Sequence, residues 1–104
     1  MNNNVFTGQV ASEVQMWGMP GRERADFWFA ERSGREPLKL AVQAYLPYVV
    51  KVAQSLEDGD VIAMAGFLRS RRGRCEERHY HYWFEARIIE PLFPRDGQRK
   101  GWDG

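Results

Sequence analysis

The chain has 104 residues and a mass of 12.1 kDa, which leaves room for one compact domain and excludes a second. Its composition, 43% hydrophobic and 28% charged, is typical of a folded protein and not of a disordered one. No apolar run approaches the roughly 18 residues that cross a bilayer, and residues 1–4 lack the features of a signal peptide. We therefore expect a cytoplasmic protein. Cys75 is the only cysteine, so an internal disulfide is excluded.

The formal net charge of +1 does not by itself indicate a nucleic-acid partner, but the distribution of charge does. Arginine outnumbers lysine among the 15 basic residues, and arginine offers a planar fork of donors that suits phosphate and stacks on rings. Five arginines fall within one short stretch: Arg69, Arg71, Arg72, Arg74 and Arg78. The bias favours recognition of an anion.

The first half of the chain is typical of strands. Residues 5–11 form a short β-rich run, and residues 14–17 lead into a turn at 18–21 that is rich in glycine and proline. Residues 25–31 are rich in aromatic side chains and predict the next strand. We expect both polar ends, residues 2–4 and 94–104, to fray.

Hydrophobic periodicity changes in the middle of the chain. From Leu38 to Ala44 every second residue is apolar, which predicts a strand with one buried side. Over residues 46–56 the apolar positions follow helical spacing, Pro47 suits a first helical turn, and Gly59 can close the helix end.

Two further strands are predicted after the helix. In residues 61–70 one side carries Ile62, Met64, Gly66 and Leu68, and the other carries Ala63, Ala65, Phe67 and Arg69. We expect Gly66 to serve as a bend in the strand. In residues 79–89 the expected inward side chains are Tyr80, Tyr82, Phe84, Ala86 and Ile88. The outward ones are then His79, His81, Trp83, Glu85, Arg87 and Ile89.

The predicted order is three strands, one helix and two strands. This is the order of the OB-fold, an all-β, five-stranded Greek-key barrel with one helix between its third and fourth strands. We expect one such domain over residues 1–93 and a flexible polar tail over 94–104.

Several short motifs resemble those of bacterial single-stranded DNA-binding proteins (SSB). Residues 56–71, LEDGDVIAMAGFLRSR, are similar to the fourth-strand region of that family, and residues 4–10, NVFTGQV, to its opening strand. Primosomal replication protein N is similar at residues 27–33, 66–68 and 84–90. The resemblance covers about residues 4–91 and implies a homo-oligomer, a tetramer in most SSB proteins and a dimer in the primosomal protein.

The resemblance also implies roles for individual residues. Tyr45 falls where the SSB family has a stacking phenylalanine, and Lys39 falls where it has a tryptophan, so a phosphate contact replaces one stacking ring. The SSB family usually carries a long tail with an acidic tip that recruits partners. Residues 95–104, which include Trp102, are shorter, so a role as a recruiting hub is not expected.

Binding of single strands needs flat rings for bases and cations for phosphates. Trp28 has the opposite parity to Phe27 and Phe29, so it faces outward if those two are core, either as a platform or at a subunit contact. Trp83, beside His81 and Arg87, is likewise either a stacking platform or part of a subunit contact. The candidate DNA-binding residues are Trp28, Lys39, Tyr45, Phe67, Arg69, Arg71, Arg72, Arg74, Arg78 and Trp83.

Catalysis and cofactors have little support in the sequence. Cys75, His79 and His81 could ligate zinc, but a fourth ligand at useful spacing is absent. There is no phosphate-binding glycine loop and no nucleophile elbow. We therefore expect a non-enzymatic protein without a cofactor or a metal that holds single-stranded DNA in replication, recombination or restart. The alternatives are a primosomal adaptor with weak DNA affinity and an RNA-binding OB domain.

Overall fold

The computed structural model describes residues 3–31, 38–72 and 80–92, and the predicted tail lies outside them. The strands and the helix are, in chain order, β1 (Asn3–Val10), β2 (Gln15–Trp17), β3 (Arg24–Glu31), β4 (Leu38–Ala44), α1 (Pro47–Gln54), β5 (Val61–Arg72) and β6 (Tyr80–Pro91). Each predicted strand and the helix are present, with shifted ends. Asn3 and Asn4 were expected to fray, but both belong to β1, which pairs with β5 from Asn3 onward.

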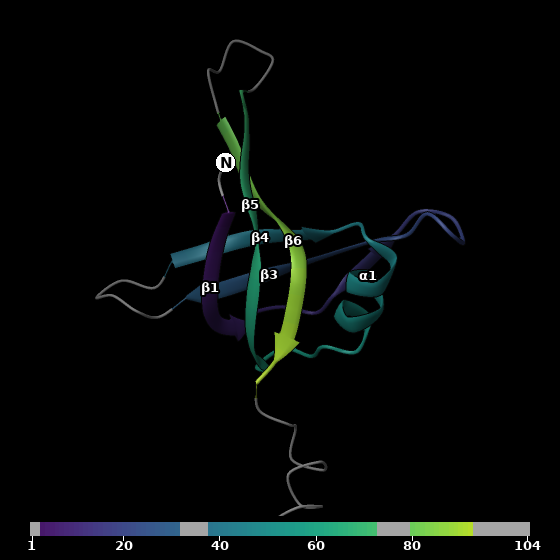
Figure 1. Cartoon of the computed structure of the whole chain (residues 1–104), viewed down its shortest axis with the longest axis horizontal. Helices are drawn as coiled ribbons and strands as arrows, with labels where there is room; N and C mark the ends of the chain where they lie inside the picture. Colours follow the sequence, from purple (N-terminus) through teal and green to yellow (C-terminus); the bar gives the residue numbers. More distant parts are fainter. Residues whose placement is uncertain (1–2, 32–37, 73–79, 93–104) are drawn as a thin grey trace, which may run out of the picture.

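Five of the strands close into a barrel in the order β1, β5, β6, β4, β3, with β3 returning to β1 through Gln9 and Val10. The pairing of β4 with β6 is parallel and the others are antiparallel. In Figure 1 the strands β1, β5 and β6 cross over β3 and β4, and α1 lies between β4 and β5 in the chain. This mixed barrel confirms the predicted OB-fold.

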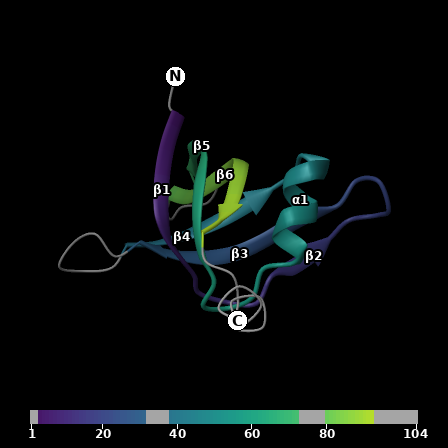
Figure 2. The same cartoon turned by 60° about the horizontal axis from the view of Figure 1, so that its bottom comes forward.

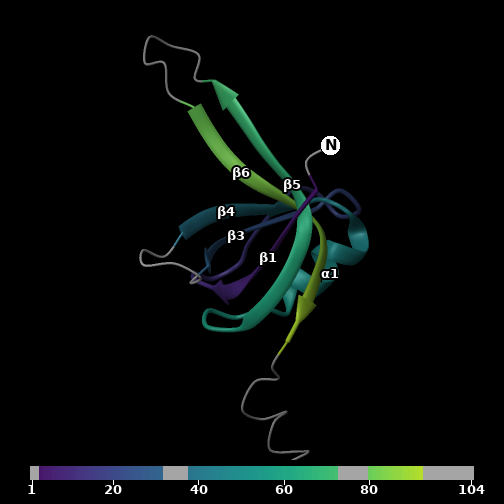
Figure 3. The same cartoon turned by 60° about the vertical axis from the view of Figure 1, so that its left-hand side comes forward.

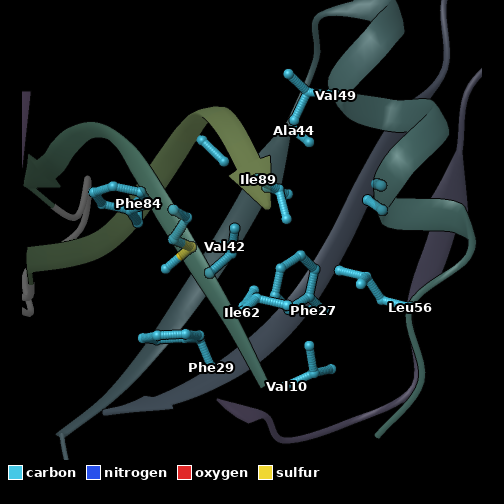
Figure 4. Close-up of a cluster of buried hydrophobic side chains, with 14 of the residues drawn as sticks. Val10, Phe27, Phe29, Val42, Ala44, Val49, Leu56, Ile62, Phe84 and Ile89 are labelled. Atoms are coloured by element: carbon cyan, nitrogen blue, oxygen red, sulfur yellow. The ribbon is translucent and has the colours of Figure 1, made fainter. Parts of the chain in front are cut away.

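The core fills the barrel with side chains from every barrel strand and from α1 (Figure 4). Phe29 and Phe84 are fully buried, and Phe6 packs edge-on against Phe84 with ring centroids 5.3 Å apart. Burying one such side chain stabilises the fold by about 1.5 to 3 kcal/mol. The other fully buried large side chains are Ile62, Met64, Val10, Val42 and Val49.

Helix α1 covers one end of the barrel beside β3, β4 and β6 (Figure 2). It begins at Pro47, as predicted, and buries Val49, Val50 and Ala53. The expectation that Gly59 closes the helix was wrong. The helix ends at Gln54, and Gly59 lies in the turn before β5, where its N–H donates to the carbonyl of Val10 at 2.8 Å. Among the described residues, no helix is long and apolar enough to span a membrane.

A β-bulge interrupts the pairing of β5 with β6. Ala65 pairs with Ile88 and Gly66 with Ala86, which leaves Arg87 as the extra residue. A Cβ on Gly66 would stand 2.0 Å from the carbonyl oxygen of Glu85, so the close approach of the two strands requires glycine.

The bulge reverses the sidedness of β6 beyond Ala86, because an extra residue shifts the alternation by one position. The inward assignment of Ile88 was therefore wrong: Ile88 is 55% exposed and Ile89 is buried. The inward assignments of Phe84 and Ala86 were correct.

The ends of β5 and β6 extend beyond the barrel as a two-stranded arm (Figure 3). The pairing of β1 with β5 stops at Phe67, and that of β4 with β6 begins at Phe84. Within the described part of the chain, the residues farther along the arm therefore pair only with each other. Tyr82 was predicted to be core, but it is exposed, as is Leu68, because no third strand among the described residues pairs with the arm at these positions. Leu38, at the outer start of β4, is exposed for the same reason.

A second hairpin joins β2 to β3, as the turn signal at residues 18–21 predicted (Figure 2). Gln15 pairs with Asp26 and Trp17 with Arg24, and the N–H of Arg22 donates to the carbonyl of Met19 at 2.8 Å. This hairpin places Trp17 beside the outward residues of β3.

Candidate functional site

The outward side of β3, β4, β6 and β5 carries rings and charged side chains from all four strands, and we call it the four-strand face. Because side chains alternate along a strand, the burial of Phe27, Val42 and Phe84 turns their neighbours outward. The register sets one continuous row across the four strands: Asp26, Gln43, Glu85 and Phe67.

Trp28 stands on this face, as the parity of β3 predicted, and is 48% exposed. Its backbone is held by the segment after β1: its N–H donates to Ser12 Oγ at 2.9 Å, and its carbonyl accepts from the N–H of Ala11 at 2.7 Å. Lys39 Nζ lies 5.9 Å from the centre of the Trp28 ring, within range of a cation–π contact. The backbone of Trp28 is therefore anchored at both polar atoms, and its ring has a cation beside it.

A groove of about 510 Å³ is lined by Trp28, Asp26 and Gln43 on this face. Ser12 and Glu13, between β1 and β2, and Gln15 of β2 also line it. Its size is within the range of small-molecule sites. A flat ligand in this groove would contact Trp28.

Tyr45 belongs to a polar network at the next position along the face. Its hydroxyl donates to Gln43 Oε1, and Arg24 Nη2 forms an ion pair with Asp26 Oδ2 at 2.8 Å. Burial by itself lowers the pKa of Arg24, but the hydrogen bond and charge of Asp26, together with the nearby Tyr45, raise that pKa above its ordinary value. Arg24 stays cationic, and its guanidinium also lies 5.9 Å from the ring of Trp17.

A second aromatic and cationic cluster occupies β5 and β6. The guanidinium carbons of Arg69 and Arg87 lie 5.3 and 5.4 Å from the centre of the Phe67 ring. Arg69 Nε also donates to Glu85 Oε1 at 2.8 Å. Arg87 reaches Phe67 from the bulge, and the hydroxyl of Tyr48 on α1 donates to the carbonyl of Arg87 at 3.3 Å.

The remaining predicted residues lie on or beyond the arm. Trp83 is half-buried opposite Arg69, on the outward side as predicted. The backbones of Arg71 and Arg72 belong to β5, opposite His81 and Tyr80. Arg74 and Arg78 lie outside the described residues, as do Cys75 and His79 of the zinc alternative. The described residues contain no cluster of three or more metal-ligating side chains.

The structure thus brings Trp28 and Lys39 together, and Phe67 and Arg69. Sequence reasoning missed Trp17, Arg24, Asp26 and Gln43, which complete the network around Tyr45. Asp26 and Gln43 have the outward parity of Trp28 and Tyr45, so the alternation that found Trp28 could have found them. That Asp26 and Gln43 lie side by side could be known only from the pairing of β3 with β4.

The sequence matches no family model and no curated protein, whereas the fold matches solved structures. The small single-stranded DNA-binding protein of Streptomyces coelicolor gives a TM-score of 0.72 at 19% identity, covering 89% of this chain and 96% of that one. The second single-stranded DNA-binding protein (SSBb) of Mycobacterium smegmatis gives 0.71 at 19% identity, with coverage of 94% and 91%.

The dimeric N-terminal domain of PriB from Thermoanaerobacter tencongensis gives a TM-score of 0.68 at 19% identity, covering 89% of this chain and 98% of that one. At these identities the likeness is one of fold. It confirms, at that level, the resemblance to SSB and primosomal proteins that the sequence motifs indicated.

Proposed function

We propose that this chain binds single-stranded DNA on the four-strand face and is not an enzyme. The observation that carries the proposal is the pairing of rings with cations: Trp28 with Lys39, and Phe67 with Arg69 and Arg87. Bases stack on aromatic faces whatever their sequence, and cations beside the rings neutralise the phosphates that follow. The role would be in replication, recombination or restart, in the cytoplasm.

The arm of β5 and β6 extends this face. Arg69 lies at its base, and the other arginines of the same stretch, Arg71, Arg72, Arg74 and Arg78, follow it in the sequence. We propose that these arginines follow the phosphate backbone of a strand that also contacts Trp83. A chain of such contacts makes affinity fall with salt, with a slope of log K against log salt of about −0.7 per phosphate contact on a single strand.

Trp28 offers the sharpest test of base stacking. Replacing a stacking ring by alanine costs about 1 to 3 kcal/mol per base, which is a loss of affinity of roughly 5-fold to 150-fold. Trp28→Ala should show that loss for a fluorescein-labelled oligo-dT measured by anisotropy, and Trp28→Phe should retain most of the affinity because it keeps a ring. Equal affinities for all three proteins would contradict a stacking role for this residue.

We also propose that the protein works as a homo-oligomer. Among the described residues, the first part of β1, through Gly8, pairs only with β5 and leaves its other edge open. Val5, 70% exposed, and Ile88, 55% exposed, flank Ala65 in one apolar row beside that edge. An open edge next to apolar side chains favours association with a second strand. Light scattering on the pure protein measures the subunit number.

The adaptor alternative is favoured by a different observation. Met16, Trp17 and Met19 are exposed on the β2–β3 hairpin, and Met19 is 68% exposed. Exposed apolar residues that cluster in this way favour contact with a protein partner. An adaptor would keep its partner binding when Trp28 and Tyr45 are replaced, whereas a DNA-coating protein would lose its main activity.

The RNA-binding alternative has its own test. Parallel titrations with oligo-dT and oligo-U separate DNA binding from RNA binding.

A further inference from the structure

Glu85 lies in the middle of the four-strand face, where a negative charge opposes the binding of an anion. The register places it opposite Phe67 on β5 and beside Gln43 on β4. Its carboxylate forms an ion pair with Arg69, Nε to Oε1 at 2.8 Å. Arg69 stands at the base of the arm, where the proposed path of the strand leaves the barrel.

The surroundings of this ion pair keep Arg69 within reach of a ligand. The Arg69 side chain is 48% exposed and that of Glu85 is 21% exposed, so the guanidinium is the more open of the two partners. Arg69 and Arg87 lie at similar distances from the Phe67 ring. A phosphate beside Phe67 would thus meet two guanidinium groups, one of which already holds a carboxylate.

A carboxylate and a phosphate bind a guanidinium in the same way, because both accept charge-assisted hydrogen bonds from its N–H groups. An exposed ion pair of this kind is worth only about 0.2 to 1 kcal/mol, so an incoming phosphate can replace the carboxylate. The exchange leaves Glu85 without its hydrogen bond and close to the new anion, and both effects reduce the net gain in affinity.

We infer that Glu85 is an intramolecular competitor of the DNA phosphates for Arg69, and that it weakens the binding of single strands and favours their release. This inference rests on the proposed function and assigns a regulating residue to the same face. A positioning role for Glu85 predicts the opposite result. If Glu85 served only to hold Arg69 in a productive orientation, its removal would weaken DNA binding. The two roles predict changes of opposite sign.

The experiment compares Glu85→Gln with Glu90→Gln. Both variants remove one negative charge from β6, but Glu90 is exposed opposite Ala63, far along the strand from Arg69. Affinity for a labelled oligo-dT is measured by anisotropy at several salt concentrations. A third protein, Arg69→Gln, and the double variant with Glu85→Gln complete a cycle that isolates the contribution of the pair.

We expect Glu85→Gln to bind about two to five times more tightly than Glu90→Gln, the range set by the strength of an exposed ion pair. Its salt slope should steepen by about 0.7, because one more cation becomes available to phosphate. The gain should vanish in the Arg69→Gln background. Equal or weaker binding by Glu85→Gln, or a gain that persists without Arg69, would overturn the inference.

The same titrations separate this inference from the proposed function. Binding by the wild type with no gain in Glu85→Gln refutes only the role of Glu85. Absence of binding by both proteins at low salt refutes both statements. Binding by Glu85→Gln alone would support competition strongly, because it would show that the carboxylate masks the site.

Discussion

Gly66→Ala tests whether the bulge that presents Arg87 depends on the close approach of β5 and β6. An alanine Cβ at this position would stand 2.0 Å from the Glu85 carbonyl oxygen and 3.0 Å from the Arg87 nitrogen. An ordinary contact begins at 3.4 Å, so the two strands must separate by about 1.4 Å. The obstacle is backbone within a hydrogen-bonded ladder, which cannot rotate away as a side chain can.

The magnitude follows from the cost of overpacking. Extra methyl groups forced into a packed site cost about 1 to 3 kcal/mol, and occasionally more. We expect about 3 kcal/mol here, since the clash is with backbone. In a domain of this size each kcal/mol lowers the Tm by about 4 to 8 °C, so the Tm should fall by roughly 12 to 24 °C.

Gly21→Ala is the matched control for this measurement. Gly21 has a φ of +87° but nothing within 4 Å of a built Cβ, so alanine there suffers backbone strain without a clash. That strain costs about 1 to 2 kcal/mol. Thermal unfolding followed by circular dichroism should rank the proteins as wild type, Gly21→Ala, then Gly66→Ala. A Gly66→Ala protein as stable as the control would refute the argument from close approach.

Three further outcomes are expected. Lys39→Ala should weaken oligo-dT binding several-fold and reduce the salt slope by about 0.7 in the anisotropy titration. The control is Lys51→Ala, because Lys51 is exposed on α1, and it should change neither the affinity nor the salt slope. Phe84→Ala should destabilise the fold by about 3 to 5 kcal/mol in urea unfolding, because its ring is fully buried; a loss below about 1 kcal/mol would contradict the assigned core. Asp26→Asn, which weakens the partly exposed pair with Arg24, should cost less than about 1 kcal/mol in that assay, and a larger loss would show that the pair is structurally required.

Local patterns predicted much of the fold because periodicity reports directly on burial. The alternation of Phe27, Trp28 and Phe29 was enough to place the indole outside the barrel, and the spacing of Val49, Val50 and Ala53 was enough to identify the helix. The order of these elements then indicated the OB-fold, which the strand pairing confirms.

These local patterns could not predict features that depend on contacts between strands far apart in the sequence. The bulge at Arg87 arises from the approach of two strands at Gly66, so the exposure of Ile88 could not be read from β6 alone. The exposure of Tyr82 depends on where β4 stops pairing with β6, and the place of Gln43 beside Asp26 depends on the register of β3 and β4. The roles of the arm arginines stay predictions.

We propose above all that rings and neighbouring cations on the four-strand face bind unpaired nucleotides. Titration of the wild-type protein with single-stranded and double-stranded oligonucleotides, followed by tryptophan fluorescence at two salt concentrations, tests it most directly. We expect quenching by the single strand, weaker binding at the higher salt, and much weaker binding of the duplex, whose bases are already stacked. Unchanged fluorescence and no binding of the single strand at low salt would contradict it.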